Sequence, residues 1–176
     1  MSAMKSLPPN TAEFARVFEK HSDSFVTIGG APTLLHIEQR EGELQRKTDD
    51  LDIVILDVGG DGDEDGFLTL FAKYVGDNGY ECGKLASGKA QSYRFTNPNN
   101  GLAPRILEIS TRRKEGIPLA RAAQRLEEFE MSAIVCEPYF VDLLKAHREN
   151  LVIEEAQKLV LPVARPALLV LMKAYA

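Results

Sequence analysis

The chain has 176 residues and a formal net charge of −5, with 44% hydrophobic and 27% charged residues. These values are typical of one globular domain with a sizeable core, and no apolar run approaches the ~20 residues that span a bilayer. The acidic charge argues against a general polyanion binder, so DNA is not expected as a partner. With no secretory signal and two distant cysteines, Cys82 and Cys136, we expect a cytoplasmic protein that has no membrane partner.

The first expected element is a helix over residues 11–20, and a strand–turn–helix unit follows it. In this unit, residues 24–28 read as a short strand that runs directly into Gly29 and Gly30. The apolar residues of 31–35 then have helical spacing. Glycines allow backbone N–H groups to approach a phosphate without obstruction by a Cβ atom, although an ordinary tight turn would have the same pattern.

The next strand carries two acidic residues at its start. Residues 51–56 are an aliphatic run of strand length, and Asp50 and Asp52 lie two positions apart. Side chains at i and i+2 of a strand share one face, so the two carboxylates project side by side. Two charges this close repel unless a cation lies between them, and Mg²⁺ is a natural occupant. The alternative is a pair of ordinary acids on an edge strand.

The middle of the chain is expected to form a loop, a helix and three strands. Residues 59–66 read as an acidic loop without the order of a calcium-binding loop, and residues 67–75 as an amphipathic helix. Residues 80–85, 91–96 and 105–111 read as three short strands that extend the sheet in an antiparallel manner.

The last third of the chain is expected to be mainly helical. Apolar stripes predict helices over residues 119–129 and 140–146. Residues 159–176 predict a short strand, a turn at Pro166 and a helix with a buried stripe. Lys173 lies outside that stripe.

The order strand, Gly-Gly, helix, then Thr48-Asp49-Asp50-Leu51-Asp52-Ile53 resembles the signature of the DNA polymerase beta-like nucleotidyltransferase superfamily. It looks most like the nucleotidyltransferase-type toxins of bacterial abortive-infection and toxin–antitoxin systems. One departure is the 19 residues that separate Gly30 from Asp50. The expected fold is α/β (α+β), with a small mixed sheet and helices packed mainly on one face. Residues 1–176 would form one nucleotidyltransferase-like domain that is truncated at its C-terminus, because the family pattern continues past Lys173.

The resemblance implies roles for individual residues. Asp50, Asp52 and Glu108 would be catalytic and would hold two Mg²⁺ ions, with Glu108 matching the third carboxylate on a later strand. A lone strand glutamate can also simply face solvent, and Asp57 is a weaker competitor for this role. The residues expected to bind the nucleoside triphosphate are Gly29, Gly30, Lys47, Thr48 and Lys173.

The activity that the resemblance implies is transfer of a nucleoside monophosphate from an NTP to an acceptor hydroxyl on tRNA or protein. The resemblance also implies that the protein is the toxin of a toxin–antitoxin pair, with a cognate antitoxin as its partner. Two alternatives remain open. One is a catalytically silent module of the same fold that senses a nucleotide or binds a partner. The other is a nucleotidyltransferase that modifies a small antibiotic.

Overall fold

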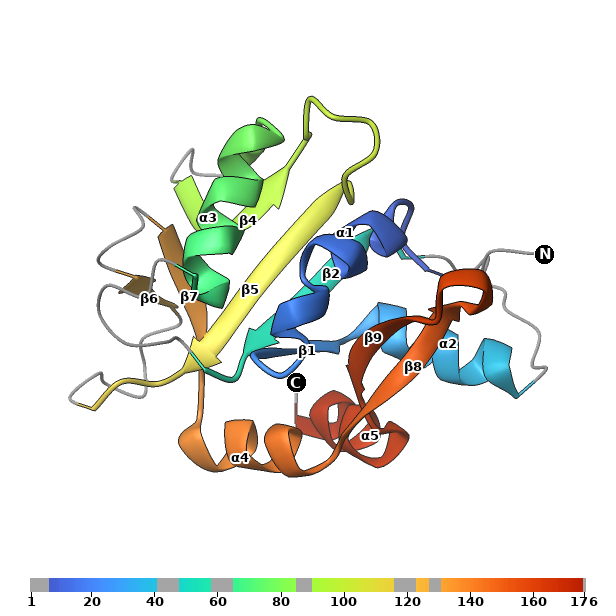
Figure 1. Ribbon diagram of the computed structural model, residues 1–176. Coiled ribbons are helices and arrows are strands. Elements are labelled where there is room, and N and C mark those ends of the chain that lie inside the picture. The colour runs from blue at the N-terminus through green and yellow to red at the C-terminus, as the bar shows by residue number, and fades with distance from the viewer. Residues whose placement is uncertain are drawn as a thin grey trace.

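The protein is described by a computed structural model over residues 7–40, 48–57, 65–84, 90–115, 123–126 and 131–175. Within these stretches it has a mixed α/β structure (Figure 1). The helices are α1 (Thr11–Val17), α2 (Gly30–Gln39), α3 (Phe67–Asp77), α4 (Pro138–Ala146) and α5 (Pro166–Tyr175). The strands are β1 (Phe25–Ile28), β2 (Asp50–Ile55), β3 (Glu81–Lys84), β4 (Ala90–Thr96), β5 (Ile106–Arg112), β6 (Ala123–Leu126), β7 (Met131–Cys136), β8 (Arg148–Glu154) and β9 (Leu159–Ala164).

All strands of the described stretches belong to one mixed sheet. Its main order is β3-β4-β5-β2-β1-β9-β8, and β7 pairs with both β5 and β6. The pairs β2–β5, β1–β9 and β5–β7 are parallel, while the other pairs are antiparallel. The expected mixed sheet is therefore confirmed, with β2 near its centre between β1 and β5.

Helices cover both faces of the sheet, so the expectation that they pack mainly on one face is wrong. Ile53 of β2 belongs to the same core cluster as Phe71 of α3, and α1 packs into that cluster. Val54, the next residue, belongs to a second cluster with Leu144 of α4 and Leu168 of α5. The physical reason is that successive strand residues point to opposite faces, and β2 is apolar on both.

The α3 helix confirms the amphipathic pattern read from the sequence. Phe67, Leu68, Phe71 and Tyr74 are buried, and the helix ends two residues before Gly79, which has a φ of 63°. Phe18, which follows α1, lies at the centre of a ring cluster made with Phe14, Phe25, Phe67, Phe71 and Tyr74. Burial of each such ring contributes on the order of 1.5–3 kcal/mol, so this cluster anchors both helices to the sheet.

The segment after β5 contradicts the sequence prediction. Instead of a helix over residues 119–129, the described part contains β6, which pairs antiparallel with β7. Strand pairing with β7 overrides the local helical spacing of the apolar residues. The helix over residues 140–146 is confirmed as α4, and α5 begins at Pro166 as expected.

The predicted acidic loop lies almost wholly outside the described residues. No helix in the described stretches has the length and apolar character needed to cross a bilayer.

Candidate functional site

The acidic pair lies at the beginning of β2, where Asp50 is the first residue of the strand and Asp52 the third. Leu51 and Ile53 are buried, whereas Asp50 and Asp52 are only partly buried and share the opposite face. The pKa of Asp52 is raised to about 6, first by burial and second by the Asp50 carboxylate, while the Arg94 guanidinium acts in the opposite direction. The expected side-by-side arrangement is therefore present, together with the mutual repulsion that it implies.

Glu108 lies beside this pair. It is the register partner of Asp52 in the parallel pairing of β2 with β5, and Asp50 lies opposite Ile106. Side chains of register partners in neighbouring strands point to the same face. The three carboxylates named by the sequence thus gather on one face of the sheet. Asp57, the weaker competitor, follows the opposite end of β2 and is not part of this cluster.

Arg94 of β4 joins the three carboxylates, and the sequence analysis did not identify it. It is the register partner of Glu108 and forms an ion pair with that carboxylate. Its Nη2 atom also lies 3.4 Å from Oδ2 of Asp50. The available signal was an arginine in the middle of a strand, next to the buried Phe95, but the sequence does not say which strand lies alongside.

The double glycine lies directly against the acidic pair. Gly29 has a φ of 75°, which favours glycine, and a Cβ atom at this position would collide with Oδ2 of Asp52 and come within 3.2 Å of its Cγ. A Cβ atom on Gly30 would lie 3.1 Å from Oγ1 of Thr48. The turn between β1 and α2 therefore needs glycine because the start of β2 approaches it so closely.

This turn also presents the N-terminus of α2 to the site. The Gly29 cap has no side-chain hydrogen bond, and the first turn of α2 contains no acidic residue. The Oγ1 atom of Thr33 donates a hydrogen bond to the Gly29 carbonyl over 2.8 Å, which fixes the turn. The N–H groups at a helix N-terminus attract anions, so this end of α2 can bind phosphate.

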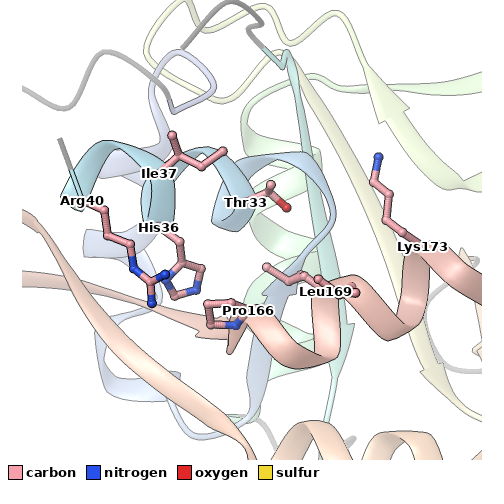
Figure 2. A pocket seen from close by; sticks show the side chains of 8 residues that line it. Thr33, His36, Ile37, Arg40, Pro166, Leu169 and Lys173 are labelled. Atoms are coloured by element: carbon pink, nitrogen blue, oxygen red, sulfur yellow. The ribbon is translucent and has the colours of Figure 1, made fainter. Parts of the chain in front are cut away.

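Lys173 lies on α5, on the sheet face that also carries the acidic pair. It lines a pocket of about 370 Å³ between α2 and α5, together with Thr33, His36, Ile37, Arg40, Pro166, Leu169 and Val170. Figure 2 shows Arg40 at one end of this pocket and Lys173 at the other, with Pro166 and Leu169 between them. Lys173 therefore lies at the end of the pocket opposite Arg40, on the side of the beginning of α2 where Thr33 is found.

The donor set suits a hard divalent cation. Three carboxylates supply oxygen ligands, and burial and then the Asp50 charge raise the pKa of Asp52, so a nearby cation would favour its charged form. Within the described stretches, however, no three His, Cys, Asp or Glu side chains are already arranged as metal ligands. Arg94 instead pairs with two of these carboxylates, Asp50 and Glu108.

The structure brings Gly29, Gly30, Thr48, Asp50, Asp52 and Glu108 together, and it places Lys173 on the same face. Lys47 lies outside the described residues. No protein-family model, curated protein or solved structure matches this chain.

Proposed function

We propose that this protein is a metal-dependent nucleotidyltransferase with a nucleotidyltransferase fold, which moves a nucleoside monophosphate from an NTP to an acceptor hydroxyl. The observation that carries the proposal is the close approach of Gly29 to Asp52, with Asp50 and Glu108 beside them. A glycine turn at a helix N-terminus can bind phosphates, and three adjacent carboxylates can bind cations. A ligand that combines phosphate with a metal ion makes use of both at once.

Each group has a distinct task. Asp50, Asp52 and Glu108 would hold Mg²⁺, which supplies charge neutralisation and activation of the acceptor oxygen. The N–H groups of the Gly29–Gly30 turn bind the triphosphate and hold its α-phosphorus next to the carboxylates. The acceptor hydroxyl then loses its proton to solvent as its oxygen attacks this phosphorus in line, the bond from the α-phosphorus to the β-phosphate oxygen breaks, and pyrophosphate leaves.

Two lysines would supply positive charge to the triphosphate, one from α5 and one from the segment before β2. Lys173 would neutralise the triphosphate at the pocket end near Thr33, and Thr48 would contribute its hydroxyl beside Gly30. Lys47 keeps its expected role as a nucleotide-binding residue. The resemblance favours tRNA or protein as the acceptor, and it favours a cytoplasmic toxin that a cognate antitoxin neutralises.

The test is transfer of label from α-labelled NTPs to tRNA, to protein and to a hydroxylated antibiotic. We expect Mg²⁺-dependent label in one acceptor class, and none with Asp50→Asn/Asp52→Asn. The control is Asp49→Asn, because Asp49 directly precedes the pair and its side chain is 53% exposed. Transfer at the wild-type rate by the double variant would contradict the proposal. The acceptor that receives label distinguishes the toxin-type activity from antibiotic modification.

A second candidate is a catalytically silent module that senses a nucleotide or binds a partner. The Arg94 ion pairs favour it, since the single charge of this guanidinium is shared between two of the three carboxylates. This candidate predicts NTP binding that is independent of Mg²⁺ and is unchanged by Asp50→Asn/Asp52→Asn. Abolition of binding when Mg²⁺ is removed would exclude it.

A further inference from the structure

Arg94 belongs to a row of register partners that runs across three neighbouring strands, β4, β5 and β2. In this row, Arg94 of β4 lies opposite Glu108 of β5, which in turn lies opposite Asp52 of β2. The guanidinium uses Nη1 to contact Oε1 of Glu108 and Nη2 to contact Oδ2 of Asp50. One side chain thus bridges two of the three carboxylates that the proposed function assigns to metal.

The neighbouring strand is shaped to accept the stem of Arg94. A Cβ atom on Gly83 of β3 would lie 3.2 Å from both Cβ and the carbonyl oxygen of Arg94, and 3.3 Å from its Cδ. The pairing of β3 with β4 also shifts its register between Cys82 and Gly83. A larger residue at position 83 would push against Arg94 from this side. The absence of a side chain there allows the arginine to lie along the sheet toward the carboxylates.

We propose that Arg94 is a positioning residue that holds the carboxylates of Asp50 and Glu108 in the metal-free protein and competes with the divalent cation for them. This inference rests on the proposed function, because it assigns the same carboxylates to metal. Arg94 therefore sets the metal affinity of the site.

The competition follows from the atoms involved. Oδ2 of Asp50 and Oε1 of Glu108 accept from the guanidinium, so a metal ion that binds these oxygens has to share them with Arg94. A divalent ion beside the guanidinium would also experience like-charge repulsion in a partly buried site, where screening is weaker than in water. Metal binding therefore weakens the ion pairs of Arg94 with these carboxylates, and the ion pairs in turn oppose metal binding.

The experiment is calorimetric titration of MgCl₂ and MnCl₂, without nucleotide, into the wild-type protein and Arg94→Gln. Glutamine keeps a polar, hydrogen-bonding side chain but is shorter and has no charge. The matched control is Arg105→Gln, because Arg105 pairs with Asp49 over 3.5 Å and its side chain is 67% exposed. Thermal unfolding in EDTA establishes that each variant is folded. Arg94→Lys keeps the positive charge but lacks the planar guanidinium. Its metal affinity tests the proposal if Arg94→Gln does not fold.

We expect Arg94→Gln to bind Mn²⁺ about 10-fold more tightly than the wild type, which corresponds to about 1.4 kcal/mol. Arg94→Lys should lie between the two, since an ammonium group cannot bridge two carboxylates with a rigid fork. Arg105→Gln should bind within about twofold of the wild type, because exposed ion pairs contribute little.

The outcomes separate the two proposals. Equal metal affinity of the wild type and both Arg94 variants would overturn the role of Arg94 and leave the metal-dependent function intact. Absence of metal binding in every protein would overturn both. Metal binding by Arg94→Gln but not by the wild type would support the competition, and it would overturn metal-dependent catalysis in the wild-type chain.

Discussion

Replacement of Asp52 by asparagine tests the electrostatics of the acidic cluster directly. The change keeps the size of the side chain and removes one of the three negative charges. In the metal-free protein the pKa of Asp52 is raised from 3.8 to about 6, mainly by burial and then by Asp50. The charged form is therefore unfavourable in the fold, and its removal should stabilise the metal-free protein.

The size of the effect follows from this pKa. The folded protein binds the Asp52 proton more tightly than the unfolded chain, so the resulting stability is fully present below pH 3.8 and is lost as the pH rises through about 6. A difference of about two pH units, at ~1.4 kcal/mol per unit, gives a loss of about 3 kcal/mol. The site is partly open to solvent, which screens the charges, so we expect Asp52→Asn to be more stable by about 1–3 kcal/mol at pH 8.

The assay is urea unfolding of both proteins in EDTA at pH 8 and at pH 4. The stability difference between them should be large at pH 8 and should shrink at pH 4, where wild-type Asp52 is protonated. Glu19→Gln, which removes an exposed acid from the 3₁₀ turn Glu19–His21, controls for the change in net charge. A wild type as stable at pH 8 as Asp52→Asn would refute the reasoning, because the carboxylate would then carry no penalty.

Two further substitutions test the glycine turn and α5. Gly29→Ala should destabilise the fold by about 1–3 kcal/mol and abolish Mg²⁺-dependent NTP binding, because its Cβ collides with Asp52 and its φ is positive. Gly76→Ala in α3, where a Cβ meets nothing within 4 Å, should instead be neutral or stabilising by up to ~1 kcal/mol in the same unfolding assay. Lys173→Met should weaken NTP binding by about tenfold in calorimetry with little change in unfolding, since charge-assisted hydrogen bonds contribute about 1.5–3 kcal/mol. Lys73→Met, on the exposed side of α3, should bind NTP as the wild type does; equal losses in both lysine variants would argue for a general charge effect.

The acidic pair could be predicted from the sequence because its geometry is local. The two-residue period of a strand places Asp50 and Asp52 on one face, and the structure confirms both this and the burial of Leu51 and Ile53. The strand–glycine–helix order likewise predicted the turn at Gly29. What the sequence could not give is the reason for the glycine, namely the approach of Asp52 from a strand more than twenty residues away.

The features that were missed depend on pairing between distant segments. Arg94 enters the site only because β4 pairs with β5 in a register that sets it opposite Glu108. The helix predicted over residues 119–129 is wrong for the same reason, since Leu126 lies opposite Met131 of β7 in an antiparallel pair. Local periodicity cannot decide between a helix and a strand when the partner strand supplies most of the stabilisation.

The central claim is that the acidic cluster and the glycine turn together bind a metal–NTP complex. The most direct measurement is calorimetric titration of each NTP, with and without Mg²⁺, into the wild type, Asp50→Asn/Asp52→Asn and the Asp49→Asn control. We expect at least one NTP to bind the wild type and Asp49→Asn only when Mg²⁺ is present, and not to bind the double variant. NTP binding that is equal in all three proteins, or equal with and without Mg²⁺, would contradict it.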